Sequence, residues 1–386
     1  MRDKPLIFVV AGEASGDALG ARLMKAMKRQ SNNHVDFIGI GGPMMSAEGL
    51  NSLFPMEELS LMGIFEILPH IRQLRKRVLQ AASVVNDQKP DAVVTIDSPG
   101  FAHAFIKRVE VKTTKIHYVA PSVWAWKPKR VFKFKEHYDH ILALLPFEPP
   151  YFEKVGLPCH FVGHSILESG ADQGDGASFR HRFSIPEKAK LLSVLPGSRK
   201  GEVTRLLPVF AEAVSKLVDD IPKLHCVIPA VPHLHDHIIE STTEWPCPVL
   251  VIPAKDQKLK YDSMAASNAA LAASGTVALE MAMAEVPTII AYKISPLTHF
   301  LVRRFIKVDF GHLLNILANH MIVPEFIQRH CKAKNLVRAL NEILEDGKGK
   351  LQIIELKQEL KKLSVDGSLP SEVAARAVLS IIQKRN

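Results

Sequence analysis

The chain has 386 residues, of which 47% are hydrophobic and 23% are charged. This length exceeds what one ordinary core holds and predicts two domains, and the composition is typical of a globular protein in water. Lys and Arg outnumber Asp and Glu by 49 to 40, and the net charge of +9 favours anionic partners such as phosphates, nucleotides or an acidic membrane face.

The four cysteines have neither Cys-x-x-Cys spacing nor histidines nearby at zinc spacing, so we expect no disulfide framework and no metal site. The apolar run 6–11 is too short for a signal peptide, and no run approaches the roughly 18 apolar residues that cross a bilayer. The charges are dispersed and no nucleic-acid-binding motif appears, so we expect no nucleic acid partner.

Apolar runs of strand length alternate with amphipathic helical stretches along the chain. In the first half we expect strands at 6–11, 37–40, 91–96, 115–119 and 140–144, and a helix over about 17–30. In the second half we expect strands at 191–195, 224–229, 249–252, 269–272 and 288–292. Uninterrupted apolar strands separated by helices predict an α/β fold with parallel sheets covered on both faces.

The pattern restarts near Gly163, which predicts two Rossmann-like domains facing a cleft. We expect the first at 1–164 and the second at 165–364, followed by a C-terminal helix of about 365–386, and the sequence leaves open whether this helix packs back on the first domain. Ligands of open parallel sheets bind outside the carboxyl ends of the strands, so the candidate residues are those that follow each strand.

Two polar turns follow strands of the first half. Gly12-Glu-Ala-Ser-Gly-Asp17 offers a tight turn before a helix N-terminus, and its Ser15 or Asp17 could equally cap that helix. It lacks the Gly-x-Gly-x-x-Gly spacing, so no dinucleotide cofactor is expected. Asp97 follows the third strand and is placed to take a proton from an attacking hydroxyl group, although capping of the next turn is an alternative.

Two small-residue turns follow strands of the second half. Leu195-Pro-Gly-Ser-Arg199 brings backbone N–H groups, a hydroxyl and a guanidinium together, which suits a diphosphate. Ala273-Ser-Gly-Thr276 opens a helix, and Glu280 lies one turn further on the same side, where it could accept hydrogen bonds from ribose hydroxyls. A capping helix with a solvated Glu280 is the alternative.

The segment 118–130, Tyr-Val-Ala-Pro-Ser-Val-Trp-Ala-Trp-Lys-Pro-Lys-Arg, holds two of the three tryptophans and is here called the Trp loop. Its proline and cation content fits neither an ordinary strand nor a helix, which indicates a loop shaped around a ligand or an aromatic plug between domains. Together with the four turns above, this segment resembles the lipid-A-disaccharide synthase family, and the resemblance extends from Gly12 to about Gln328.

The resemblance implies a GT-B hexosyltransferase of lipid A and lipopolysaccharide biosynthesis in Gram-negative bacteria. It would condense UDP-2,3-diacylglucosamine with 2,3-diacylglucosamine 1-phosphate (lipid X) to give the β(1→6) disaccharide 1-phosphate and UDP. The reaction would invert the anomeric centre and use no metal ion or cofactor. The enzyme would work in the cytoplasm, peripherally on the inner face of the inner membrane. Whether it forms a homodimer is left open.

The resemblance also implies roles for single residues. Asp97 and Arg199 would be catalytic. The substrate-binding residues would be Glu13, Ser15, Asp17, Trp124, Trp126, Lys129 and Arg130. UDP would be bound by Gly197, Ser198, Arg199, Ser274, Gly275, Thr276, Glu280 and Asn315. Gly100 and Ala102 stand where the family commonly has Asp and Asn, which makes any contact of those side chains doubtful here.

An apolar segment with a basic end precedes the third strand. Leu61, Ile64, Phe65 and Leu68 fall at helical spacing, and Arg72 and Arg75 follow. This pattern suits an acyl chain or an anionic membrane surface, although a core-facing helix with a solvated end gives the same pattern.

Three alternative functions remain open from the sequence. A UDP-sugar 2-epimerase and a lipid-linked muropeptide transferase share the architecture and the UDP site but lack the Trp loop. A non-catalytic basic protein that binds a membrane or a nucleic acid would also carry the positive charge.

Overall fold

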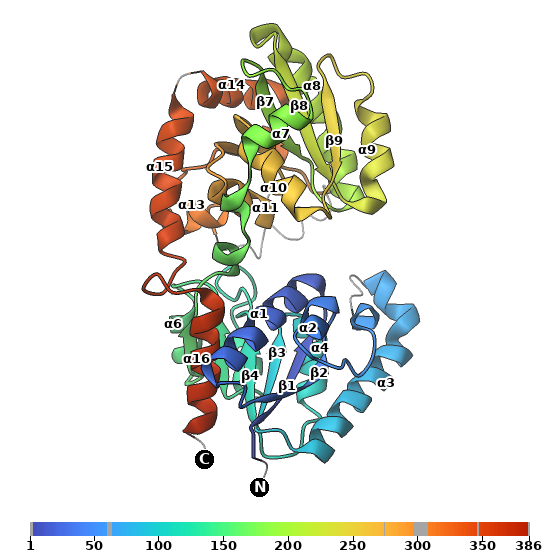
Figure 1. The fold of residues 1–386 in the computed structure, drawn as a ribbon, viewed down its shortest axis with the longest axis vertical. Helices are drawn as coiled ribbons and strands as arrows, with labels where there is room; N and C mark the ends of the chain where they lie inside the picture. Colours follow the sequence, from blue (N-terminus) through green and yellow to red (C-terminus); the bar gives the residue numbers. More distant parts are fainter. Residues whose placement is uncertain (1–2, 60–63, 274, 296–307, 346, 385–386) are drawn as a thin grey trace. The chain divides into compact units, whose positions relative to one another are not determined.

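The computed structural model describes residues 3–59, 64–273, 275–295, 308–345 and 347–384, and the side chains of 64–69 lie outside the described part. The chain divides into two compact units, each an α/β body (Figure 1). The first unit is Met1–Ser165 with Leu363–Asn386, and the second is Ile166–Lys362. The sequence places the divisions after residues 164 and 364, close to these boundaries.

The first unit is built on a parallel sheet with the strand order β2-β1-β3-β4-β5-β6. Its strands are β1 (Leu6–Ala11), β2 (Asp36–Ile40), β3 (Ala92–Ile96), β4 (Thr114–Tyr118), β5 (His140–Ala143) and β6 (Cys159–Phe161). Every residue of β1 and β3 is buried, because helices cover both faces of these central strands. Ala11 pairs with Ile96 and Ile96 with Tyr118, so the carboxyl ends of β1, β3 and β4 meet at one edge.

Helices flank this sheet on both sides (Figure 1). They are α1 (Ala14–Gln30), α2 (Pro43–Ala47), α3 (Ile64–Gln88), α4 (Pro99–Ile106), α5 (Arg130–Lys135), α6 (Pro149–Glu153) and α16 (Pro370–Gln383). Successive side chains of a strand point to opposite faces. Accordingly Ile7 and Val9 share a buried cluster with α1 and α16, whereas Phe8 and Val10 share one with α3 and α4.

The last helix of the chain, α16, belongs to the first unit. Arg29 of α1 forms an ion pair with Glu372 of α16, and Gln30 Nε2 donates to the Glu372 carbonyl oxygen at 2.9 Å. Val378 and Ile382 of α16 are buried in the same cluster as β1. The predicted helix at 365–386 overlaps this element.

The second unit is also built on a parallel sheet, with the strand order β12-β11-β10-β7-β8-β9. Its strands are β7 (Lys190–Leu195), β8 (Leu224–Ala230), β9 (Val249–Pro253), β10 (Ala269–Ala272), β11 (Thr288–Tyr292) and β12 (Glu325–Ile327). Its helices are α7 (Gly176–Arg182), α8 (Lys200–Asp220), α9 (His235–Thr242), α10 (Gln257–Ala266), α11 (Thr276–Met283), α13 (Leu313–Ala318), α14 (Ala333–Leu344) and α15 (Lys348–Lys361).

Both faces of the second sheet are also covered. Val194 of β7 shares a buried cluster with α8 and α14, and Leu191 of the same strand shares another with Phe179 of α7 and Leu259 of α10. The predicted α/β class with two parallel sheets is thus confirmed. The edge strands β6 and β12 have three residues each and were not predicted, because so short a run carries no periodic pattern.

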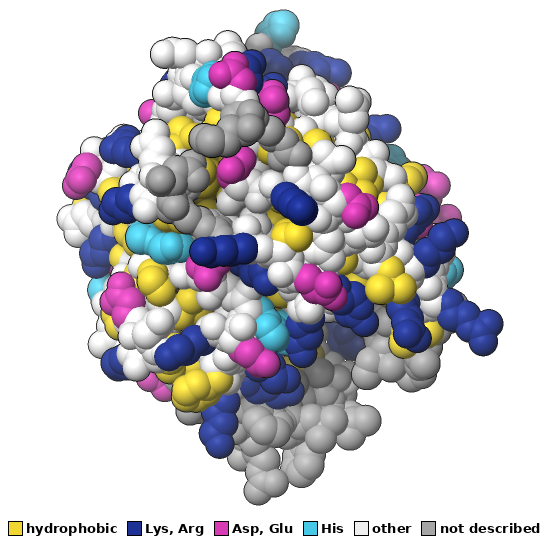
Figure 2. Space-filling model, turned by 90° about the horizontal axis from the view of Figure 1, so that it is seen from below, with side chains coloured by type: hydrophobic (Ala, Val, Ile, Leu, Met, Phe, Trp, Pro, Cys, Tyr) yellow, Lys and Arg dark blue, Asp and Glu magenta, His cyan; other side chains and the backbone are white. Residues whose placement is uncertain are grey.

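Within the described residues, no helix is long and apolar enough to cross a membrane. Figure 2 shows one face of the molecule, on which Lys and Arg side chains are spread among Asp, Glu and apolar side chains. The excess of positive charge is therefore distributed over this face.

Candidate active site

The carboxyl end of β3 carries the candidate base, Asp97. Asp97 and Ser98 both have left-handed backbone conformations, with φ of 50° and 44°. Two consecutive non-glycine residues in this region store strain, which is a feature of functional sites. The Asp97 N–H donates to the Tyr118 carbonyl oxygen at 2.9 Å, which continues the sheet by one bond and fixes this turn. Burial raises the pKa of the half-buried Asp97 carboxyl above its usual value, although an N–H of Ser98 opposes the shift.

Asp17 has a structural role in the first Gly-rich turn. Its side chain is 3% exposed, and its two oxygens accept hydrogen bonds from the N–H groups of Gly42, Met44 and Met45 at 2.8–3.0 Å. Asp17 therefore caps α2, a neighbouring helix, rather than its own helix α1. The expected substrate contact does not fit this geometry, because the carboxylate is enclosed and already bonded. Ser15 is exposed on the first turn of α1, and Glu13 lines a hollow described below.

Replacing Asp17 with asparagine is expected to destabilise the fold. The amide would turn an NH₂ group toward backbone donors, and a lost bond to a charged acceptor costs about 1–3 kcal/mol of unfolding free energy. Thermal unfolding followed by circular dichroism measures this, and Ser15→Ala, on the same turn and exposed, is the matched control with an unchanged midpoint. A native midpoint for Asp17→Asn together with a raised KM would contradict this assignment and favour substrate binding.

The Trp loop is anchored by Trp124. The indole Nε1 donates to Glu148 Oε1 at 3.1 Å, and the ring packs edge-on against Phe147 with 5.1 Å between ring centroids. Glu148 is 3% exposed, and burial raises its pKa to about 7. Trp124 thus fixes the loop, whereas Trp126 lines a hollow and has the Lys127 ammonium 5.2 Å from its ring centre.

Two hollows flank the turn that follows Asp97. The apolar hollow has a volume of about 460 Å³ and is lined mainly by residues of α3 and α4, with Arg75 among them and with Glu13, the N-cap of α1. The basic hollow has a volume of about 440 Å³ and is lined by the Trp loop, α4 and α5. Arg130 lines the basic hollow, but Lys129, its exposed neighbour and the N-cap of α5, does not.

The second unit brings its two small-residue turns to one hollow of about 260 Å³. Gly197 and Ser198 follow β7, and Gly275 and Thr276 follow β10, and all four line this hollow. Gly197 has φ of 109°, a conformation that favours glycine, and a Cβ there would lie 2.6 Å from Glu202 Oε2. The N-termini of α8 and α11 open from these turns, so N–H groups and helix dipoles favour an anion at this place.

Arg199 caps α8 and extends from this turn. Its side chain is 68% exposed, and its Nη1 lies 3.7 Å from Glu202 Oε1. A guanidinium that is largely in solvent and beside a phosphate-type loop can reach a ligand without breaking a buried network. Ser274, also expected at this site, lies outside the described residues.

Glu280 is engaged inside the protein. Its Oε2 lies 2.5 Å from Lys260 Nζ, and its Oε1 accepts from the Tyr261 hydroxyl at 3.2 Å. Lys260 lines the same hollow as Gly197 and Thr276, which adds a cation that the sequence pattern did not reveal. A ribose contact by Glu280 remains a prediction, and Lys260 is the group that reaches the hollow.

Asn315 is enclosed and fully bonded. Its Nδ2 donates to the Val323 carbonyl oxygen and to Glu325 Oε1, and its Oδ1 accepts from the N–H groups of Ile322 and Val323, all at 2.7–2.9 Å. With its amide atoms engaged and no exposure, Asn315 holds the 322–325 turn against α13 rather than offering a polar group to UDP.

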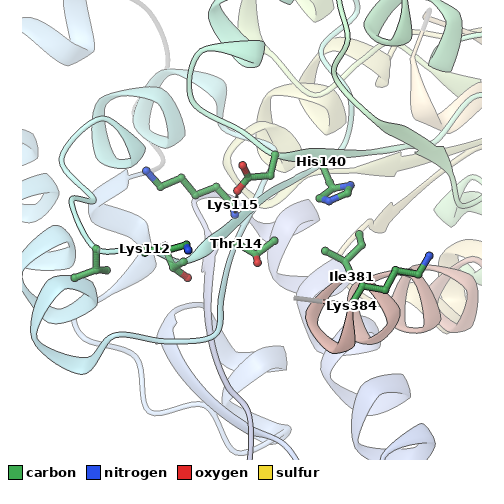
Figure 3. Close-up of a pocket in the computed structure, with 9 residues that line it drawn as sticks. Lys112, Thr114, Lys115, His140, Ile381 and Lys384 are labelled. Carbon is green, nitrogen blue, oxygen red and sulfur yellow. Dashed lines mark hydrogen bonds between the residues drawn. The ribbon is translucent and has the colours of Figure 1, made fainter. Parts of the chain in front are cut away.

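A further basic hollow, of about 600 Å³, lies at the opposite edge of the first sheet (Figure 3). Lys115 and Thr114 come from β4, His140 from β5, and Ile381 and Lys384 from the end of α16. The hollow is at the amino ends of the strands, and the Lys115 ammonium donates to the Val109 carbonyl oxygen. Ligands of open parallel sheets bind at the other edge, so this hollow is not the candidate active site.

The segment with the predicted membrane contact is only partly described. Leu61 lies outside the described residues, as do the side chains of Ile64, Phe65 and Leu68. Arg72 and Arg75 are exposed on α3. Among the described residues, no group of three His, Cys, Asp or Glu side chains could hold a metal ion.

Comparison with known proteins decides among the functions left open by the sequence. A family profile described as "Lipid-A-disaccharide synthetase" matches residues 7–378. A lipid-A-disaccharide synthase from Rhodospirillum centenum is 48% identical over 387 residues, which cover 99% of this chain and 96% of the relative. The chain belongs to the lipid-A-disaccharide synthase family. The predicted family and glycosyltransferase class are confirmed, which separates the chain from the epimerase, the muropeptide transferase and the non-catalytic protein.

Solved structures agree with a GT-B fold for this lipid-A-disaccharide synthase family member. A complex of MnaA from S. aureus with UDP has a TM-score of 0.64 at 13% identity and covers 99% of this chain and 96% of its own. A glycosyltransferase from Rickettsia africae has a TM-score of 0.60 at 13% identity and covers 99% of both chains. At this identity the likeness concerns the fold alone.

Proposed function

We propose that this chain condenses UDP-2,3-diacylglucosamine with lipid X, giving the β(1→6) disaccharide 1-phosphate and UDP. The observation that carries this proposal is Asp97, a half-buried carboxylate held in a strained turn at the carboxyl end of β3 between an apolar and a basic hollow. The acyl chains of an acylated sugar phosphate suit the apolar hollow, and its phosphate suits the basic hollow. Family membership supports the reaction class.

The chemistry is a single displacement with Asp97 as the general base. The acceptor 6-oxygen attacks the anomeric carbon of the donor while Asp97 takes its proton. A new carbon–oxygen bond forms as the bond between the anomeric carbon and the β-phosphate oxygen of UDP breaks, and UDP leaves with the electron pair of the broken bond. Attack opposite to the leaving group inverts the anomeric centre, which converts an α-linked donor into a β-linked product.

Arg199 and the turns of the second unit are proposed to stabilise the departing UDP. Negative charge grows on the diphosphate as the bond breaks, and preorganised donors aimed at it lower the barrier. Arg199, Lys260 and the N–H groups that open α8 and α11 supply that positive potential. We therefore propose that turnover needs no divalent ion and is unchanged by EDTA.

The direct experiment mixes the purified protein with lipid X and UDP-2,3-diacylglucosamine and follows the disaccharide and UDP by mass spectrometry. Formation of both in equal amounts is the expected result. Release of UDP without disaccharide, or conversion of UDP-N-acetylglucosamine into its epimer, would contradict the proposal.

We also propose that the protein works at an anionic membrane surface, which its acylated substrates require. The triple change Leu61→Ser, Ile64→Ser and Phe65→Ser is expected to abolish sedimentation with vesicles containing phosphatidylglycerol, because it removes the apolar anchor. Leu351→Ser with Ile354→Ser is the matched control, since both side chains are exposed apolar groups on α15 and should not matter. Equal vesicle binding by the triple variant and the wild type would refute the membrane contact.

A further inference from the structure

Helix α4 separates the two hollows of the first unit. Phe101 and Ala104, at i and i+3, line the apolar hollow, as does Arg108 just beyond the end of the helix. Gly100 and His103 lie on another side of the helix and line the basic hollow. Pro99 and Gly100 line both, so the two hollows meet at the turn that immediately follows Asp97 and Ser98.

The apolar hollow has walls from two helices. Ile71, Leu74 and Val78 of α3 face Phe101 and Ala104 of α4 across it. Ile71 is 56% exposed, so apolar surface is in contact with water here. Covering such surface is favourable by roughly 25 cal/mol per Å², which suits a hydrocarbon chain.

The basic hollow gathers positive charge from two elements. Arg130 and Lys133 come from α5 and Lys127 from the Trp loop, and no described residue of the lining is acidic. His103 of α4 adds an imidazole that can donate a hydrogen bond. The pKa of His103 is lowered first by burial and then by neighbouring positive charges, Lys107 being the largest of these. This local potential favours an anion, and a phosphate monoester can accept hydrogen bonds from several of these groups at once.

We propose that the acceptor binds across α4, with its phosphate in the basic hollow on His103, Arg130 and Lys133 and an acyl chain in the apolar hollow. The sugar then lies over Pro99 and Gly100, beside Asp97. Gly100 suits this place because a Cβ there would meet no atom within 4 Å, so the turn leaves open space for the ring. This inference rests on the proposed function and states how its acceptor is held.

The phosphate contact is tested by pairing a variant with a matched acceptor. Initial rates are measured with lipid X and with 2,3-diacylglucosamine lacking the phosphate, at saturating donor. In the wild type we expect loss of the phosphate to raise KM by roughly tenfold or more, the cost of a charge-assisted hydrogen bond. In Lys133→Ala the ratio of KM without the phosphate to KM with it should fall toward one. Lys135→Ala changes an exposed lysine of α5 outside the hollow and should keep the wild-type ratio. A wild-type ratio in Lys133→Ala would overturn the phosphate site.

Gly100 provides a second test that does not remove a lysine. Gly100→Glu fills the open space at the shared wall with a longer carboxylate than the Asp common in the family and should raise KM for lipid X while KM for the UDP-sugar stays the same. Gly100→Gln, equal in size but uncharged, should have a much smaller effect. Equal effects of Glu and Gln would mean that side-chain size alone matters and would contradict a phosphate there.

The acyl chain is tested by filling the apolar hollow. Ala104→Phe should raise KM for acceptors with long acyl chains and leave short-chain acceptors nearly unaffected, because only the long chain enters the filled space. Equal changes for both would overturn the acyl site. If the wild type makes no disaccharide from any acceptor, the proposed function fails; if it does but these ratios do not change, only the present inference fails.

Discussion

Replacing Asp97 with asparagine is expected to lower kcat by about 10²–10⁴-fold, the usual contribution of a positioned general base. Asparagine has nearly the same shape and, like aspartate, tolerates a left-handed backbone, so φ of 50° at this position should be retained. The loss then reports the missing proton acceptor rather than a distorted turn. Alanine is a poorer choice because it would add backbone strain at the same time.

The pH profile gives this prediction a second readout. Asp97 acts as a base only when ionised, and burial raises its pKa above the usual value. In the wild type, kcat/KM should therefore fall as the pH falls through that raised pKa, and the Asp97→Asn variant should lack this acid limb. A folded variant that keeps kcat within a few-fold and keeps the limb would show that another group takes the proton.

The second large effect is expected at Arg199. Arg199→Ala should lower kcat by about 10²–10³-fold, the loss found when one preorganised donor to a developing negative charge is removed. Affinity for UDP should weaken as well, because a charge-assisted hydrogen bond to phosphate is lost. Rates of UDP release and calorimetric titration with UDP measure the two quantities, and Arg199→Lys, which keeps the charge but not the planar fork, should lie between alanine and the wild type.

Arg205→Ala is the matched control for Arg199. Arg205 is an exposed arginine of α8 and, like Arg199, is not part of the lining of the hollow. It lies further along the chain from the Gly197-Ser198 turn, and its guanidinium donates to the Gly201 carbonyl oxygen of its own helix. Its loss should leave kcat and UDP affinity within about twofold of the wild type, since surface changes of this kind have small effects. Equal losses in Arg199→Ala and Arg205→Ala would reduce the role of Arg199 to one of general surface charge.

Central strands were predictable from the sequence because burial on both faces demands a continuous apolar run. The bounds of β1, β10 and β11 coincide with the predicted ranges. The edge strands β6 and β12 are short and half-covered, so their residues show no such run. Fold class therefore follows from pattern, whereas the sheet edges require tertiary context.

The position of a candidate residue was predictable where it follows directly on a strand, as for Asp97 and the Gly197-Ser198-Arg199 turn, whose functional roles stay predictions. It was not predictable where a role depends on which backbone the fold brings close. Asp17 bonds the start of α2 and Asn315 bonds the 322–325 turn, and neither partner is adjacent in sequence. Lys260, Lys133 and His103 lie on helices, where charged residues are usually solvated, so nothing in the pattern distinguishes them.

The position of α16 has a consequence for how this protein is made. The core of the first unit is completed by Val378 and Ile382, which leave the ribosome later than Ile166–Lys362, the continuous stretch that forms the second unit. Domains generally fold as units during synthesis. The second unit should thus complete its folding before the first unit, although synthesis of the first unit begins earlier.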